Sequence, residues 1–364
     1  MVATATLKAG MDFREYEYRR EVFHRFYEFH LKYKSHPGAV YYLMPYLAER
    51  LGWDMEAKLW FAYLNGSTQS PVTSYMLFLR FPSLKDLNLD AMADWFHQDK
   101  VYLNLLWDTD RRYHKKSFIA NIANYREKLA GRTQEEFFGD LCSKTPEANF
   151  RPVWDVVSKQ FLSFGRLTTF SYLEYLRIMG VNLDCDELFL SDMSGSKSHR
   201  NGLCKVLGRD DWDWHTSNPD FDGTYSNKAL SYLEDEASTI LAEAKQRAVG
   251  SAWEPDVSYF TLESALCTYK SWHRVNRRYP NVYNDLLYNR ITSAQDRWLR
   301  PDLSLFWDAR EASLPENLRQ ESNPQDVGCA PLKQNHYRLT GQVIMMERDW
   351  DCFQNDYADS HIKP

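Results

Sequence analysis

Apolar and polar residues recur along most of this chain with the period of an amphipathic helix. In residues 12–34 the aromatic and apolar positions follow that spacing among many charges. The same period, with Gly and Pro at the ends, predicts further helices over residues 38–51, 54–65, 71–81, 89–97, 116–129, 133–143, 149–162, 168–179, 196–207, 228–247, 259–274 and 281–299. Strand-like alternation is confined to short runs such as residues 338–346. The pattern therefore predicts a mostly α protein.

The end of the chain differs from the rest. Residues 208–227 are acidic, aromatic and loop-like, but helical periodicity returns after them. From about residue 308 onward Pro, Asn, Gln and Gly become frequent. We therefore predict one helical domain over residues 1–300 and a loop-rich C-terminal extension over residues 301–364.

Composition limits the possible partners. The 364 residues are enough to bury a sizeable core, and 15% of them are aromatic. Most of these rings should lie in that core, although rings interleaved with Arg and Lys can also stack on bases. The net charge of −6 excludes a globally basic nucleic-acid binder. Any contact with DNA must come from local basic patches.

Cysteine usage and hydropathy indicate the compartment. The six cysteines lie far apart without a C-x-x-C pair, which argues against a zinc ribbon or an iron–sulfur cluster. The N-terminal residues have no apolar signal core, and no apolar run is long enough to span a membrane. We therefore expect a soluble, cytoplasmic protein with no membrane partner.

The first candidate site is the basic segment 107–116. Arg112 and Lys115 would suit contacts with phosphate, and Tyr113 lies between them as a stacking ring. Asp110 and Tyr113 are candidates for substrate binding. The alternative is a solvated loop with local ion pairs.

The second candidate site is segment 261–279. Glu263, Cys267 and Lys270 fall near one face of the predicted helix, at spacings of four and three. A Glu and a Lys on such a face occur as ion pairs in active sites and in scaffolds alike. Arg278 would lie near the end of that helix, where positive charge is favoured.

The third candidate site is the apolar segment 59–68, which ends in a small polar cluster. Asn65 and Thr68 are candidates to bind a small polar ligand. Ordinary chemistry at a helix terminus is the alternative.

The fourth candidate site lies in segment 163–202. Gly165 opens a predicted helix, and Asp192 precedes a second one that is rich in Ser, Lys, His and Arg. Helix N-termini favour phosphate, and a carboxylate beside them can take a proton. The candidates for phosphate are Arg166, Ser194, Ser196, Lys197, His199 and Arg200. Ser stands where a P-loop requires Gly, and with no second histidine nearby we expect no metal site at His199.

In order and spacing, these segments resemble a phage family of amino acid:DNA transferases over roughly residues 15–295. Its members are also described as alpha-glutamyl/putrescinyl-thymine pyrophosphorylases, and the helical domain of 5-hydroxymethyluracil DNA kinases is related to them. That family is in turn similar to the helix-hairpin-helix DNA glycosylases. Gly165 and Asp192 stand at the places of the hairpin glycine and the catalytic aspartate of those enzymes. Arg166 departs from the glycosylase pattern, in which a small residue or Pro is usual.

The resemblance implies two helical lobes with a catalytic cleft between them, and chemistry on a thymine-derived base that carries a pyrophosphate. Loss of pyrophosphate leaves an electrophilic methylene, which an amine captures. Asp192, Glu263 and Lys270 are then the catalytic candidates, and the cations named above, with Arg278, bind pyrophosphate or the DNA backbone. The base must be flipped out of the duplex to react.

The expected partners are double-stranded DNA with modified thymine and an amino acid or other amine, in the cytoplasm of a phage-infected host. We expect no cofactor except Mg²⁺ brought by pyrophosphate. A glycosylase that excises a modified base and a non-catalytic DNA-binding module are the alternatives. The amine used, the DNA sequence context and the oligomeric state stay open.

Overall fold

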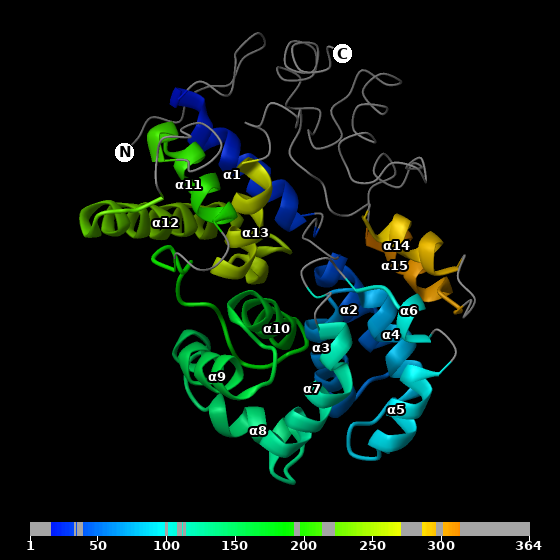
Figure 1. The fold of residues 1–364 in the computed structure, drawn as a ribbon. Helices are drawn as coiled ribbons and strands as arrows, with labels where there is room; N and C mark the ends of the chain where they lie inside the picture. Colours follow the sequence, from blue (N-terminus) through cyan, green and yellow to red (C-terminus); the bar gives the residue numbers. More distant parts are fainter. Residues whose placement is uncertain are drawn as a thin grey trace. The chain divides into compact units, whose positions relative to one another are not determined.

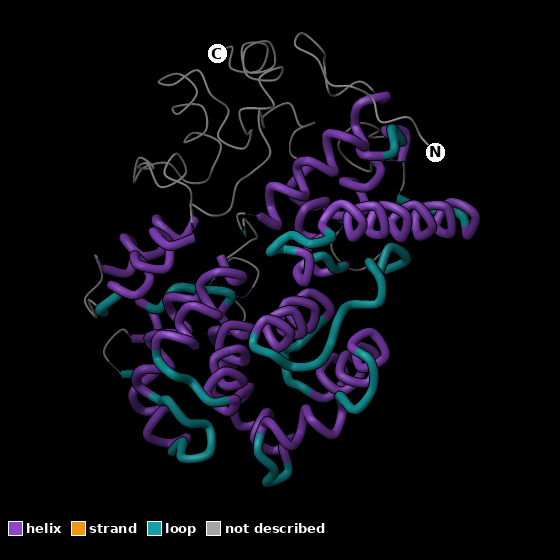
Figure 2. The backbone as a smooth tube through the Cα atoms, turned by 180° about the vertical axis from the view of Figure 1, so that it is seen from behind, coloured by secondary structure: helices purple, strands orange, loops and turns teal. Residues whose placement is uncertain are grey.

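Helices account for nearly all the regular structure that the computed structural model describes (Figures 1 and 2). It describes residues 16–32, 34, 39–98, 101–107, 111, 114–192, 197–212, 223–270, 286–295 and 301–313. These residues contain no strand, so the prediction of a mostly α protein is confirmed. The strand-like run at 338–346 lies outside the described residues.

The chain divides into two units, each made of segments that are distant in the sequence. One unit comprises residues 1–37, 187–286 and 313–364, and the other comprises residues 38–186 and 287–312. We call them the α11–α13 unit and the α3–α10 unit, after the helices that pack at their centres. Neither unit is a continuous stretch of chain, because residues 1–37 join the first unit and residues 287–312 join the second.

The described part of the α11–α13 unit contains four main helices. Helix α1 packs against the other three, and α11 packs most extensively against α13 (Figure 1). Two short 3₁₀ helices, η3 (Asp210–Trp212) and η4 (Glu254–Asp256), lie between the longer elements. The main helices are α1 (Tyr16–Lys32), α11 (Ser198–Val206), α12 (Asn227–Ala248) and α13 (Tyr259–Tyr269).

Polar contacts fix helix α1 against α12 and α13. Arg20 donates hydrogen bonds to Glu243 of α12 at 3.0 Å. Toward α13, the hydroxyl of Tyr27 lies 2.6 Å from the hydroxyl of Thr261. The ring of Phe23 meets Tyr269 edge-on, with 5.2 Å between ring centroids. Because Phe23, Tyr27 and Tyr269 are all fully buried, the aromatic richness of this segment is used for core packing.

The α3–α10 unit is built around helix α3. Ten consecutive residues from Leu59 to Thr68 are buried, because helices cover α3 on several sides. A helix that is buried all round needs no polar face, which explains its weak amphipathic pattern. The helices of this unit are α2 (Val40–Arg50), α3 (Met55–Thr68), α4 (Pro71–Arg80), α5 (Leu89–His97), α6 (Val101–Asn104), α7 (His114–Leu129), α8 (Gln134–Leu141), α9 (Pro146–Gln160), α10 (Arg166–Ile178), α14 (Leu286–Gln295) and α15 (Ser304–Ser313).

Three elements of this unit differ from the sequence prediction, of which the short helix α6 was not predicted at all. Helix α3 continues through Gly66 to Thr68 instead of ending at residue 65. A side chain at Gly66 would approach the Tyr172 ring to 3.1 Å, so the glycine serves close packing there, not termination. Helix α15 lies in the extension that was predicted to be rich in loops. It forms there because Phe306 is fully buried against Tyr75, with ring centroids 5.1 Å apart.

Among the described helices, none combines the length and the apolarity that crossing a bilayer would take.

Candidate active site

Helices α11 and α13 approach each other so closely that only glycine fits at their contact. A Cβ atom on Gly202 of α11 would lie 2.1 Å from the carbonyl oxygen of Leu266 on α13. Real Cβ atoms essentially never approach another heavy atom to less than 3.0 Å. Gly202 therefore sets the separation of the two helices and of the side chains beside it.

Three side chains meet at this contact. His199 lies one turn before Gly202, and Glu263 and Cys267 lie on either side of Leu266 on α13. His199 Nδ1 is 3.1 Å from Glu263 Oε1, and the thiol of Cys267 donates to the same oxygen at 3.4 Å. His199 is 1% exposed and the Glu263 side chain 13%. The cluster is thus largely removed from water.

Lys270 continues this face of α13 for one more turn. It is the C-cap residue of the helix and is buried. Its ammonium donates to the hydroxyl of Ser198, the first residue of α11. Lys197, half-buried, is the residue just before α11. A positive charge therefore lies beside the His199–Glu263–Cys267 cluster.

Arg200 joins helix α11 to the segment before it. The guanidinium donates to the carbonyl oxygen of Leu190 at 2.8 Å and lies 5.0 Å above the centre of the Tyr225 ring. It is 1% exposed. Within the part of the chain that the structure describes, its Nε and Nη2 have no hydrogen-bond partner. These buried donors are costly unless an acceptor satisfies them.

Asp192 follows the Leu190 segment and is half-exposed. Its backbone N–H donates to the carbonyl of Phe189 at 3.1 Å, and Phe189 has a φ of 54°. This left-handed residue turns the chain sharply just before Asp192. The structure thus places Asp192, Lys197, His199, Arg200, Glu263 and Lys270 in the α11–α13 unit.

Gly165 lies in the short connection between α9 and α10. Ser163 takes the left-handed conformation with a φ of 68°, whereas Gly165 has an ordinary φ of −72°. A Cβ on Gly165 would meet nothing within 4 Å. Neither its conformation nor its packing requires glycine, so the open space in front of it is its distinguishing property. Arg166, half-buried, begins α10.

Part of the basic segment 107–116 is used for packing. Arg111 is fully buried and donates to the carbonyl oxygen of Gly66 at 3.1 Å. His114 is also fully buried, and burial together with the charge of Arg111 lowers its pKa to about 4. Lys115 donates to the carbonyl of Leu105 at 2.8 Å. Arg112, Asp110 and Tyr113 lie outside the described residues.

The polar cluster at the end of α3 is also internal. Asn65 and Thr68 are fully buried. The Ser74 hydroxyl lies 2.7 Å from that of Thr68 and donates to Asn65 Oδ1 at 3.3 Å. Ser74 thus supplies hydrogen-bond partners within the protein to both Asn65 and Thr68. The role of Asn65 and Thr68 in substrate binding stays a prediction.

Three other predicted residues, Ser194, Ser196 and Arg278, also lie outside the described residues. The catalytic and binding roles given to all the site residues likewise stay predictions.

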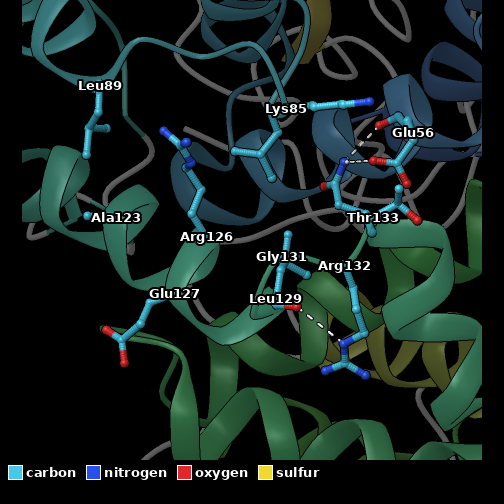
Figure 3. A pocket seen from close by; sticks show the side chains of 12 residues that line it. Glu56, Lys85, Leu89, Ala123, Arg126, Glu127, Leu129, Gly131, Arg132 and Thr133 are labelled. Carbon is cyan, nitrogen blue, oxygen red and sulfur yellow. Dashed lines mark hydrogen bonds between the residues drawn. The ribbon is translucent and has the colours of Figure 1, made fainter.

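The α3–α10 unit has a pocket of about 630 Å³ at a different place (Figure 3). Two of its cations are held by backbone carbonyls: Arg126 donates to Leu87 at 2.9 Å and Arg132 to Leu129 at 3.3 Å. The pocket is lined by Glu56, Leu84, Lys85, Leu89, Ala123, Arg126, Glu127, Leu129, Gly131, Arg132, Thr133 and Gln134. None of the residues predicted for the site is among them.

Comparison with known proteins decides the family. The sequence profile of the amino acid:DNA transferases matches residues 39–279, two thirds of the chain. The chain belongs to this family. The matched region contains the connection between α9 and α10, the segment with Asp192 and the contact of α11 with α13. The resemblance predicted from the sequence is therefore confirmed over these residues.

One curated relative is a protein of Salmonella phage ViI named serinyltransferase. It is 26% identical over 278 residues, and the match covers 74% of this chain and 66% of that protein. The chain thus matches just under two thirds of the relative's length. No solved structure matches the chain significantly. The likeness to helix-hairpin-helix glycosylases therefore stays a prediction.

Sequence reasoning missed the pairing of His199 with the face of α13. It placed Glu263, Cys267 and Lys270 on one face, and the thiol–carboxylate hydrogen bond confirms the first two. The partner helix was not predicted, because contacts between distant segments leave little periodic signal. Gly202 in the middle of a helix was the available hint, since such a glycine often marks a close packing contact.

Proposed function

We propose that this protein transfers an amino acid, such as glycine, or a similar amine to 5-pyrophosphorylmethyl-deoxyuridine in DNA and releases pyrophosphate. The family match over residues 39–279 carries the proposal. The relative from phage ViI, named a serinyltransferase, makes serine the first amine to test. The reaction breaks the bond between the exocyclic carbon and the pyrophosphate oxygen, whose electron pair leaves with pyrophosphate.

Buried cations at the start of α11 suit the leaving group. Pyrophosphate is highly charged, and charge-assisted hydrogen bonds from Arg and Lys are the strongest that a protein offers it. The Nε and Nη2 donors of Arg200 lack an acceptor among the described residues. Lys270 and Lys197 add positive charge near the same helix end. We assign these three residues to pyrophosphate.

Asp192 is the better candidate to take the proton of the amine. Glu263 is already in contact with His199 and Cys267, whereas Asp192 is half-exposed on the segment that leads to α11. The amine nitrogen bonds to the exocyclic carbon, and its proton passes to the carboxylate. The glycosidic bond is untouched, in contrast to the reaction of a glycosylase.

Gly165 is our proposed contact with the DNA backbone. Phosphate binds well at a helix N-terminus, and the open space in front of Gly165 allows the backbone of the protein to come close to it. Arg166 would add a positive charge at the same place. The target base would have to leave the stack to react.

The experiment uses DNA that carries 5-pyrophosphorylmethyl-deoxyuridine, with serine and the other amino acids offered together. Nucleosides are then analysed by mass spectrometry. We expect Asp192→Asn to slow transfer by about 10²–10⁴-fold, the range typical of a lost general base. Asp186→Asn is the matched control, since Asp186 lies on the same segment and pairs with Arg151 instead.

Full transfer by Asp192→Asn would remove Asp192 from the mechanism. Abasic sites made by the wild-type protein would indicate a glycosylase. Binding to the DNA with no change in the nucleosides would indicate a non-catalytic module.

A further inference from the structure

The His199–Glu263–Cys267 cluster has the composition and spacing of a metal site. One possible ligand atom from each side chain lies within 4.8 Å of the other two. Bond lengths of about 2.3 Å to sulfur and about 2.0–2.1 Å to nitrogen and oxygen place tetrahedral ligand atoms roughly 3.3–3.8 Å apart. The 3.1 and 3.4 Å contacts of Glu263 Oε1 are close to these values. Side-chain rotations that move the ligand atoms by about 1 Å would bring the Cys267 sulfur and the His199 imidazole nitrogen to a tetrahedral separation as well.

The imidazole of His199 supplies an independent observation. It is 1% exposed, and neither ring nitrogen has a hydrogen-bond partner within the described part of the chain. Burying such a group without a partner costs about 1–3 kcal/mol. Its Nδ1 atom nevertheless lies 3.1 Å from Oε1 of Glu263, the oxygen that accepts from the Cys267 thiol, without forming a hydrogen bond to it. A bond from a metal ion to one ring nitrogen would give that nitrogen a partner.

Charge balance favours a divalent ion that accepts sulfur. We propose that His199, Glu263 and Cys267 bind one Zn²⁺ ion. A carboxylate, a thiolate and a neutral imidazole together cancel its two positive charges in a largely buried place. Mg²⁺ prefers oxygen ligands only, so it is the wrong ion for a set with thiolate and imidazole. This proposal replaces our sequence-based expectation of no metal, which considered only a second histidine.

Three protein ligands leave a fourth position of the zinc ion open, as in catalytic zinc sites. Lys270, one turn beyond Cys267, lies beside that cluster through its bond to Ser198. We assign the open position to an oxygen of pyrophosphate, where the metal would act as a Lewis acid on the leaving group. This role rests on the proposed function, whereas the site itself does not. With Glu263 on the metal, Asp192 remains to take the proton.

The test measures metal and needs no DNA. The full chain is purified, loaded with Zn²⁺, freed of excess ion and analysed by elemental mass spectrometry. We expect about one zinc ion per chain in the wild type, and a loss of at least tenfold in occupancy for Cys267→Ser and His199→Ala. Cys142→Ser is the matched control, because Cys142 is also half-buried but lies in the other unit. It should keep the full amount.

Loading the wild-type chain with Co²⁺ covers the case in which a variant fails to fold. Thiolate bound to Co²⁺ gives a charge-transfer absorption, which we expect in the wild type and in Cys142→Ser. A wild-type chain with neither zinc nor this absorption would overturn the proposal, as would a folded Cys267→Ser that binds as much zinc as the wild type. A chain that binds zinc but modifies no DNA would support the site and contradict the proposed function.

Discussion

Replacing Gly202 with Ala tests whether the contact of α11 with α13 holds the site together. The added Cβ would lie 2.1 Å from the Leu266 carbonyl oxygen and 2.6 Å from its carbon. Ordinary contacts begin at 3.4 Å, so the gap must open by 3.4 − 2.1 = 1.3 Å. Both obstacles are backbone atoms of a helix and cannot rotate away. The two helices must therefore separate.

The expected change in the free energy of unfolding of Gly202→Ala follows from two opposing effects. Overpacking of this kind costs about 1–3 kcal/mol, and the better helix propensity of Ala returns up to about 1 kcal/mol. We expect a net loss of about 1–2 kcal/mol in the free energy of unfolding. The same separation would widen the 3.1 Å distance between His199 Nδ1 and Glu263 Oε1 to about 4 Å or more, which should weaken the binding of one shared metal ion.

The assay compares urea unfolding, zinc occupancy and DNA transfer in Gly202→Ala and Gly139→Ala. Gly139 is also helical, in α8, but a Cβ there meets nothing within 4 Å. The free energy of unfolding of Gly139→Ala should therefore rise by up to about 1 kcal/mol, because Ala has the better helix propensity. If Gly202→Ala were as stable as the wild type, with zinc and transfer unchanged, our account of the α11–α13 contact would be wrong.

Three further predictions concern single residues. Gly165→Ala should leave stability unchanged but weaken DNA binding in a gel-shift titration, because nothing in the protein fills the space before it. His114 has a folded pKa of about 4, below its usual value, so stability should fall as pH drops from about 6.5 to about 4; urea midpoints of His114→Asn should show a smaller fall. Burial opposes ionisation of Glu243, but hydrogen bonds from Arg20 and His24 outweigh it and lower the pKa of the carboxyl. Glu243→Gln should thus destabilise by less than about 1 kcal/mol at pH 7, and by less still once the pH has fallen through the lowered pKa of the wild-type carboxyl.

Much of the helical content could be predicted from the sequence. The apolar period gave α5 with both ends correct at residues 89 and 97. Its start is marked by Asn88, whose side chain accepts a hydrogen bond from the backbone N–H of Ala91. Helix α15 was missed, because a short segment becomes helical here only when Phe306 is buried. Propensity describes a segment alone, whereas burial depends on its neighbours.

The candidate site was less predictable. Asn65, Thr68 and Lys115 were expected to contact a ligand. The structure gives each of them partners within the protein, and their binding roles stay predictions. Sequence composition cannot distinguish a polar cluster whose hydrogen bonds are internal from one whose hydrogen bonds are made to a ligand. In contrast, Glu263 and Cys267 were correctly placed together, since a spacing of four residues within one helix fixes their distance.

The most direct test of the proposed function follows pyrophosphate and nucleosides in a single reaction. Wild-type protein is incubated with DNA that carries 5-pyrophosphorylmethyl-deoxyuridine and with isotope-labelled serine. We predict a new nucleoside that contains the labelled amine, formed in the same amount as the released pyrophosphate. Pyrophosphate release without a new amine-bearing nucleoside from any amino acid, or the appearance of abasic sites, would contradict the proposal.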